Sequence, residues 1–194
     1  MFYRPADGHG LPHNPFNALV TPRPIGWIST RGPLGDNLAP YSFFNAVAYV
    51  PPQVMFASTG VKDSLNNLRE AGVFAVNVVG EAALAAMSAT SEGFAPGTDE
   101  FAAVGVAKAE CSTIDCPRVA DAPATLECVV TGVTQLKGQG NFLILGEVTG
   151  VHIADACLVD GRFDPARYNP VARMGYRDYT VVRDVFERRR PDDI

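Results

Sequence analysis

Two segments of the chain combine side chains and backbone shapes that could bind a small molecule. The first, residues 36–45, reads DNLAPYSFFN and mixes amides, hydroxyls and aromatic rings with the bend expected at Pro40. Such a segment can bring backbone N–H groups and a hydroxyl against a flat heteroaromatic ring. The alternative is a β-turn followed by an edge strand, and composition alone favours that alternative.

The second segment, residues 58–67, reads STGVKDSLNN and passes from a strand into a helix. Free N–H groups at a helix N-terminus, together with Lys62, favour an anion such as phosphate. The alternative is plain N-capping of the helix by Asp63 or Ser64. Because the carboxylate of Asp63 would repel an anion, we assign Asp63 the capping role.

Catalytic signatures of other kinds are absent from the sequence. There is no Walker loop, no G-x-S-x-G and no H-E-x-x-H, and three histidines (His9, His13 and His152) leave few ways to build a catalytic triad. The G-Q-G run at residues 138–140 is better read as a hairpin turn than as a dinucleotide fingerprint. The chain is therefore expected to borrow its chemistry from a cofactor.

The four cysteines are not expected to bind a metal. They are Cys111, Cys116, Cys128 and Cys157, and their spacing matches no common zinc-ligand pattern. We expect reduced, mostly buried thiols and no metal site.

Composition predicts one globular domain, residues 1–194, with a sizeable core. The chain has 194 residues, is 47% hydrophobic and carries a formal net charge of −5, which argues against nucleic-acid binding and polybasic membrane attachment. No apolar stretch is long enough to cross a membrane and the N-terminus lacks a signal-peptide pattern, so we expect a cytoplasmic protein.

The elements that must position the two polar segments are mostly strands. Apolar runs predict strands over residues 24–30, 53–58 and 73–79, with residues 36–45 as a loop entering a short strand. Helical spacing predicts a helix over residues 62–71, ended by Gly72, and an Ala-rich helix over residues 81–89. Residues 124–130 and 142–153 predict a long hairpin around residues 137–141. Together these favour an antiparallel β-barrel or sandwich with short helices.

The order and spacing of several motifs resemble the flavin reductase-like, FMN-binding split-barrel family. The motifs are PRPIGWIST at residues 22–30, NLAPYSFFN at 37–45 and KDSLNNL at 62–68. The likeness continues through residues 74–78, 146–152 and 173–179, and so covers about residues 15–182. It implies a mainly β fold, a six-stranded antiparallel Greek-key split barrel with short flanking helices, and a homodimer that binds FMN near the subunit interface.

The resemblance also implies roles for individual residues. Backbone donors of the first segment would line the flavin ring and ribityl chain, and the strand-to-helix segment would hold the phosphate. The implied cofactor-binding residues are Arg23, Asn37, Ala39, Pro40, Tyr41, Ser42, Asn45, Ser58, Thr59, Lys62, Ser64, Asn67 and Arg173. His152 resembles a family histidine near the flavin or nicotinamide, which implies a catalytic role; a structural histidine at a strand end is the alternative.

The activity implied by the resemblance is an NAD(P)H-dependent flavin reductase, in which a nicotinamide passes a hydride to flavin N5. Reduced FMN could then serve a partner monooxygenase or another electron acceptor. One alternative is a flavoredoxin-like, FMN-binding electron carrier with little NAD(P)H activity, and another is a β-barrel that binds no flavin. The sequence leaves the choice between NADH and NADPH open.

Overall fold

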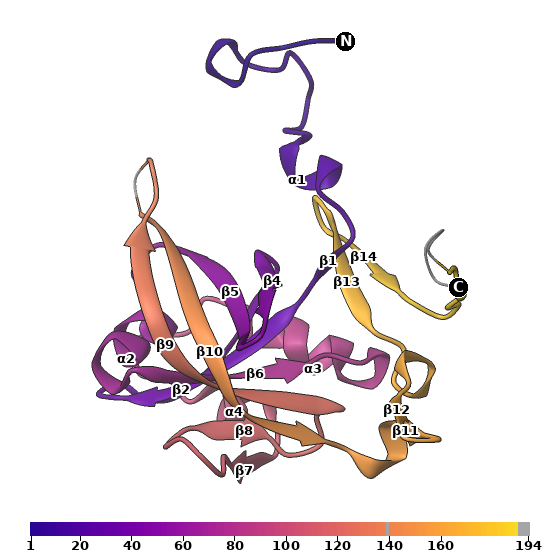
Figure 1. The fold of residues 1–194 in the computed structure, drawn as a ribbon. Coiled ribbons are helices and arrows are strands. Elements are labelled where there is room, and N and C mark those ends of the chain that lie inside the picture. Colours follow the sequence, from indigo (N-terminus) through magenta and orange to yellow (C-terminus); the bar gives the residue numbers. More distant parts are fainter. Residues whose placement is uncertain (139, 190–194) are drawn as a thin grey trace.

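The computed structural model describes residues 1–138 and 140–189, and its fold is mainly β (Figure 1). One antiparallel sheet of seven strands dominates, in the order β3-β2-β6-β9-β10-β5-β4. Its strands are β2 (Gly26–Gly32), β3 (Gly35–Tyr41), β4 (Phe44–Tyr49), β5 (Pro52–Thr59), β6 (Val73–Val78), β9 (Ala124–Gln135) and β10 (Asn141–Ile153). This confirms the predicted antiparallel barrel architecture, with seven strands where six were expected.

The extra strand comes from residues 36–45, for which a loop entering a short strand was expected. Most of this segment lies in β3, which pairs with β2 along its whole length and places Pro40 opposite Trp27. Proline is tolerated here because β3 is an edge strand and its other side needs no backbone donor. Only Ser42 and Phe43 separate β3 from β4, at the opposite end of the strand order, and β3 also contacts β5, so the sheet curls into a barrel.

Smaller elements surround the barrel. β1 (Arg23–Pro24), β13 (Val171–Gly175) and β14 (Asp178–Val181) form a separate sheet that rises beside it with α1 (Phe16–Leu19) (Figure 1). Two short hairpins pair β7 (Lys108–Glu110) with β8 (Pro117–Val119) and β11 (Leu158–Val159) with β12 (Arg162–Phe163). The remaining helices are α2 (Asp63–Ala71), α3 (Leu84–Ala89) and α4 (Glu100–Val104), with 3-10 turns at Pro5–Asp7, Glu81–Ala83, Asp155–Cys157 and Pro165–Arg167.

Most local predictions match these elements. The helix predicted over residues 62–71 is α2, and it ends at Gly72 in the left-handed conformation, with φ of 71°. The Ala-rich segment begins as a 3-10 turn and continues as α3. The long hairpin is formed by β9 and β10; of its predicted turn, residue 139 lies outside the described residues.

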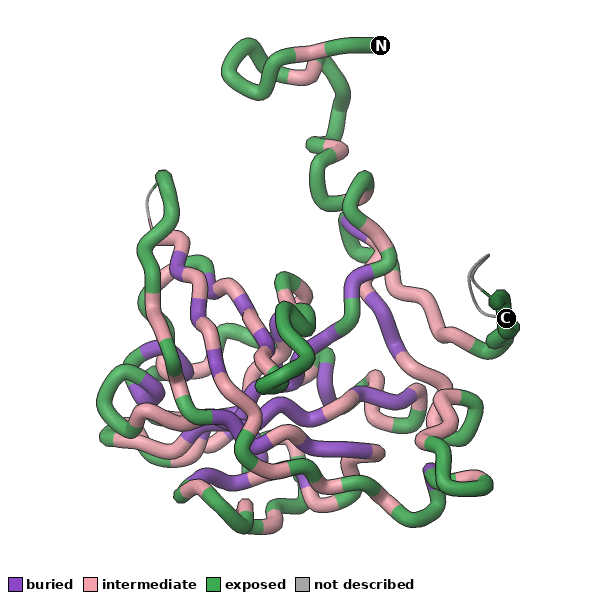
Figure 2. The backbone as a smooth tube through the Cα atoms, in the orientation of Figure 1, coloured by how far each residue is buried: buried purple, intermediate pink, exposed green. Residues whose placement is uncertain are grey.

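The core consists of two clusters, seen as purple stretches of the tube in Figure 2. Inside the barrel, Phe56, Phe74 and Ile144 pack with Leu65 and Leu68 of α2, and all five are fully buried. Because residues 65 and 68 are three apart, one face of α2 supplies both. This burial fixes the position of the α2 N-terminus.

The second cluster lies between the sheet and helices α3 and α4. Trp27, Leu38, Met87 and Phe101 are its largest buried members. The indole Nε1 of Trp27 donates a hydrogen bond to the Thr90 hydroxyl at 2.9 Å. This contact anchors the start of the loop between α3 and α4.

The remaining sequence predictions concern thiols and membrane spans. All four cysteines are free. Within residues 1–138 and 140–189, no helix is long and apolar enough to span a membrane.

Candidate functional site

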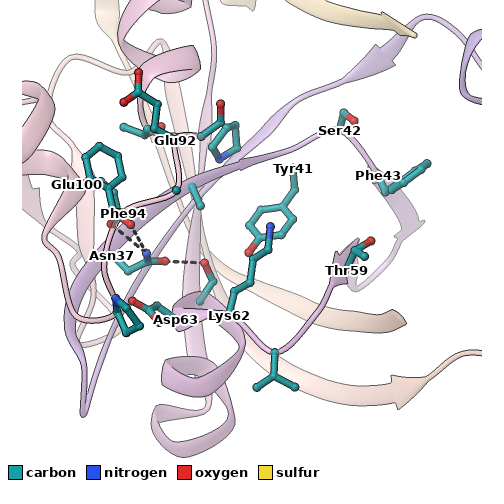
Figure 3. A pocket seen from close by; sticks show the side chains of 18 of the residues that line it. Asn37, Tyr41, Ser42, Phe43, Thr59, Lys62, Asp63, Glu92, Phe94 and Glu100 are labelled. Carbon is teal, nitrogen blue, oxygen red and sulfur yellow. Dashed lines mark hydrogen bonds between the residues drawn. The ribbon is translucent and has the colours of Figure 1, made fainter. Parts of the chain in front are cut away.

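A cavity of about 510 Å³ opens where four elements meet: β3, the end of β5, the N-terminus of α2, and the loop between α3 and α4 (Figure 3). We call it the α2 cavity. Eight of the residues implied by the family resemblance line it: Asn37, Ala39, Pro40, Tyr41, Ser42, Thr59, Lys62 and Ser64. The two polar segments of the sequence are thus brought together around one space.

The α2 cavity contains a helix N-terminus that no side chain caps. The N-cap residue is Lys62, whose backbone is extended and whose side chain makes no capping hydrogen bond. The predicted caps are wrong: Asp63 accepts a hydrogen bond from the Gly97 N–H at 2.7 Å, and the Ser64 hydroxyl donates to Asn37 Oδ1 at 2.5 Å. Neither side chain is turned back to the first-turn N–H groups, so those donors remain available to an anion.

Lys62 adds a positive charge beside those donors. Its ammonium group forms no ion pair within the described residues, and the side chain reaches into the cavity past Tyr41 in Figure 3. An unpaired ammonium beside open helix N–H groups can bind an anion such as phosphate, although the carboxylates of Asp63, Glu92 and Glu100 line the same cavity.

A buried polar network forms the floor of the cavity. Asn37 Nδ2 donates to both carboxylate oxygens of Glu100 at 2.9 Å, and the Leu38 N–H donates to the same carboxylate at 2.9 Å. Asn37 Oδ1 in turn accepts from the Ser64 hydroxyl. The dashed lines in Figure 3 mark the hydrogen bonds of Asn37. Burial raises the pKa of Glu100 above its usual value. The network ties β3, α4 and α2 into one unit.

Tyr41 offers a hydrogen-bonding group that the protein itself leaves unused. Its ring packs against Phe56, with ring centroids 4.8 Å apart, and its residue is 8% exposed. The hydroxyl is buried and makes no hydrogen bond of regular geometry among the described residues, and burial raises its pKa, although the nearby hydroxyls of Ser64 and Ser58 lower it in part. A buried polar group without a partner needs an explanation, and a bound polar ligand in the α2 cavity provides one.

Sequence reasoning missed one wall of this cavity. The loop between α3 and α4 contributes Thr90, Ser91, Glu92, Gly93, Phe94 and Pro96, and Glu100 follows it. The only sequence signal in this stretch is its glycine and proline content, which predicts a turn and says nothing about where the turn lies.

A second cavity, of about 480 Å³, lies on the other side of the β3–β4 junction. We call it the hairpin cavity, because residues near the tip of the β9–β10 hairpin line it. Ser42, Phe43, Ala57 and Thr59 line both cavities. Of the residues implied by the resemblance, the hairpin cavity adds Arg23, Asn45 and Ser58.

Arg23 is the charged side chain most deeply placed in the hairpin cavity. It is 7% exposed, and its Nη1 donates to the backbone carbonyls of Asn17 and Val20. Its guanidinium carbon lies 5.5 Å from the centre of the Phe43 ring. Burial, and then the charge of Arg173, lowers the pKa of Arg23.

Two of the expected cofactor residues line neither cavity. The Asn67 amide is fully buried between α2 and the β2–β3 hairpin, where it donates to Gly35 O at 3.0 Å and accepts from the Leu34 N–H at 3.2 Å. Arg173 lies beside Arg23 across the β1–β13 pair and donates to the Tyr179 hydroxyl at 2.5 Å. In this structure both residues hold parts of the fold together.

His152 also lies outside the lining of both cavities. Its Nε2 forms a short hydrogen bond with the carboxylate of Glu127, whose side chain is fully buried. The same carboxylate accepts the Ser112 and Thr113 N–H groups at 2.6 Å. This placement agrees with the structural alternative for His152, and its catalytic role stays a prediction.

Comparisons with known proteins agree with the resemblance. A model of the "Flavin reductase like domain" matches residues 19–167. An uncharacterized protein from Deinococcus radiodurans is 40% identical over 184 residues, which cover 88% of this chain and 80% of that protein. Among solved structures, nitrilotriacetate monooxygenase component B from Bacillus cereus superposes with a TM-score of 0.84 at 27% identity, over 93% of this chain and 99% of that one. The 2-nitrobenzoate 2-nitroreductase NbaA from Pseudomonas fluorescens gives 0.83 at 28% identity, over 92% and 90%.

The family match spans most of the chain, including β1–β10 and both polar segments. It confirms the family predicted from the motifs, and the chain therefore belongs to the flavin reductase-like domain family.

Proposed function

We propose that the chain is an FMN-binding flavoprotein that acts as an NAD(P)H-dependent flavin reductase. The observation that carries the proposal is the uncapped N-terminus of α2 beside the unpaired Lys62, opening into a cavity of a chain that matches the flavin reductase like domain. Bound FMN would supply, at N5, the hydride acceptor for NADH or NADPH.

The lining of the α2 cavity supports FMN as its ligand. Lys62, Thr59 and the first-turn N–H groups of α2 would hold the phosphate, because they combine a positive charge with several donors. Ser42, which lines both cavities, and Tyr41, which lines the α2 cavity alone, would line the flavin ring. The orphaned Tyr41 hydroxyl supports a ligand with hydrogen-bond acceptors at this depth.

The floor network has a different task. Glu100, Asn37 and Ser64 hydrogen-bond one another and line the cavity together. Their mutual bonds fix the spacing between β3 and the α2 N-terminus, so the two ends of the cofactor would meet preorganised surfaces.

No side chain is required as a nucleophile for this chemistry. The protein's part would be to hold the flavin and a nicotinamide ring close and parallel, and to exclude water from the space between them. Phe43, which is half exposed and lines both cavities, is positioned to separate or support two such rings.

The expected partners are proposals as well. The likeness to a protein named as a monooxygenase component supports a role in delivering reduced flavin to a partner monooxygenase. A homodimer is supported by the exposed apolar end of β4, where Tyr49 and the following Val50 are 90% and 84% exposed. Light scattering of the purified chain measures the oligomeric state directly.

The test of the function is an absorbance spectrum of the purified protein, followed by anaerobic addition of NADH and NADPH. Flavin bands that bleach within seconds support the reductase. Bands that persist with both nucleotides and bleach only with dithionite support the flavoredoxin-like electron carrier instead. A colourless protein that does not bind added FMN would refute both.

A further inference from the structure

We propose that the hairpin cavity is a second binding site, and that it takes an aromatic carboxylate. The geometry assigns the anionic group of such a ligand to Arg23 and Lys137. Its flat apolar part would lie on the residues that line both cavities, which we call the shared wall: Ser42, Phe43, Ala57 and Thr59. The inference rests on the proposed function in one respect, because it leaves the α2 cavity to FMN.

The first argument is the charge of the lining. Arg23 and Lys137 line the hairpin cavity, and no aspartate or glutamate of the described part of the chain does. The α2 cavity differs, because Asp63, Glu92 and Glu100 line it together with Lys62. The lining of the hairpin cavity is therefore the more positive of the two.

The second argument is that the positive charge of Arg23 is uncompensated. Arg23 forms no ion pair within the described residues, although it is 7% exposed, and Arg173 is its direct cross-strand neighbour. Its Nη1 is bonded to carbonyls, whereas its Nε has no partner within residues 1–138 and 140–189. Buried charges in proteins are normally paired, so a site that leaves one unpaired beside a cavity suits an anion.

The third argument is the apolar surface opposite the two cations. Met55 and Leu143 line the cavity, and the Phe43 ring lies on its shared wall with the Arg23 guanidinium over one face. Apolar and aromatic side chains with few polar groups are the usual lining of a site for a flat organic molecule. An aromatic ring on this surface places a carboxylate within reach of the guanidinium.

The position of the hairpin cavity beside the α2 cavity indicates that its ligand would react with the flavin. The hairpin cavity and the α2 cavity share four lining residues, which are Ser42, Phe43, Ala57 and Thr59. A molecule in the hairpin cavity thus lies beside a flavin in the α2 cavity, as reacting partners must.

The experiment measures binding by isothermal titration calorimetry, with benzoate and its neutral isostere benzamide as probes. The full chain is used both free of flavin and loaded with FMN. We expect benzoate to bind at least about tenfold more tightly than benzamide, because a charge-assisted hydrogen bond replaces a neutral one. Equal affinities for the two probes would overturn the proposal.

Variants then locate the site. Lys137→Glu is expected to weaken benzoate binding about fivefold or more and to leave benzamide binding unchanged. Arg162→Glu, the same charge reversal at an exposed position on β12, is the matched control and should change neither. Arg23→Gln should weaken benzoate binding about tenfold or more. If Arg23→Gln does not fold, as judged by its melting curve, Lys137→Glu alone decides.

Two results separate this inference from the proposed function. Displacement of benzoate by FMN would mean that the two cations serve the flavin itself, and the second site would be refuted. Charge-selective benzoate binding to a protein that ignores FMN would refute the proposed function and leave the site intact.

Discussion

Replacing Lys62 with alanine tests the proposed phosphate site, because Lys62 is an exposed residue of that site. In the structure the ammonium of Lys62 makes no ion pair within the described residues, and its side chain does not cap α2. The substitution therefore removes a charge from the cavity without removing a contact that stabilises the fold.

The magnitude follows from the kind of bond that is lost. A charge-assisted hydrogen bond contributes about 1.5–3 kcal/mol, which is about a 10- to 150-fold increase in Kd for FMN. Lys62 is exposed in the free protein, so we expect the lower end of that range. The N–H groups of α2 remain in the variant, so FMN binding is weakened and not abolished.

The assay is quenching of FMN fluorescence during titration, repeated with riboflavin, which lacks the phosphate. Lys62→Ala should weaken FMN binding and leave riboflavin binding unchanged, and the difference should shrink as salt is added. Arg162→Ala serves as the control for general loss of charge. Unchanged FMN affinity in a folded variant, or an equal loss for riboflavin, would remove Lys62 from the phosphate site.

Three further substitutions test the framework around the site. His152→Ala is expected to lower the free energy of unfolding by about 1–3 kcal/mol, because the buried Glu127 carboxylate loses a hydrogen bond. If His152 is also catalytic, the variant reduces its flavin more slowly than wild type in stopped flow, at unchanged FMN affinity. Equal reduction rates in the variant and wild type would exclude the catalytic role. Burial alone would raise the pKa of Glu127, but bonds from Thr113, Ser112 and His152 outweigh it and lower the pKa to about 2 from 4.5. The stability that Glu127 contributes is thus complete above pH 4.5 and lost as pH falls toward 2, and urea unfolding of Glu127→Gln against wild type should show a difference that shrinks over that window. Gly146→Ala places a Cβ 2.5 Å from the fully buried Phe74 ring and should cost about 1–3 kcal/mol in urea unfolding, whereas Gly132→Ala, with its nearest neighbour at 3.9 Å, should cost less; equal losses would contradict the packing argument.

Elements with local signals could be predicted from the sequence. The apolar spacing of Leu65 and Leu68 and the stop at Gly72 determine α2 within a few residues, because both depend on helix geometry alone. The β9–β10 hairpin was predictable for the same reason, since alternation and a glycine-containing turn are local properties. Residues 36–45 were harder, because a proline signals a loop unless the strand is known to lie at an edge.

The residues of the candidate site also fall into those that a local motif identifies and those that only the tertiary fold explains. Lys62 and Tyr41 belong to short motifs and could be identified from them. The partners of Asp63 and Ser64 are Gly97 and Asn37, which lie 34 and 27 residues away, so local capping rules assigned both side chains wrongly. Asn67 was expected to bind the cofactor because it lies in a binding motif. In the structure its amide instead holds the β2–β3 hairpin to α2.

Glu100 had no signal at all in the sequence. It lies 63 residues after Asn37, and only the tertiary fold brings its carboxylate to the two donors of β3. Long-range contacts of this kind carry no periodicity or spacing that a single sequence could reveal.

The floor network also sets a limit on transplanting this cavity into another protein. A graft of residues 36–45 would carry Asn37 without the carboxylate of Glu100, and the Asn37 amide and the Leu38 N–H would then be buried with no acceptor. Adding α4 would still leave Asn37 Oδ1 without the hydroxyl of Ser64. The smallest portable unit is therefore discontinuous, with one piece from β3, one from the start of α2 and one from α4. Natural variation should obey the same rule, so that a change at one of the three positions is tolerated only when the other two change with it.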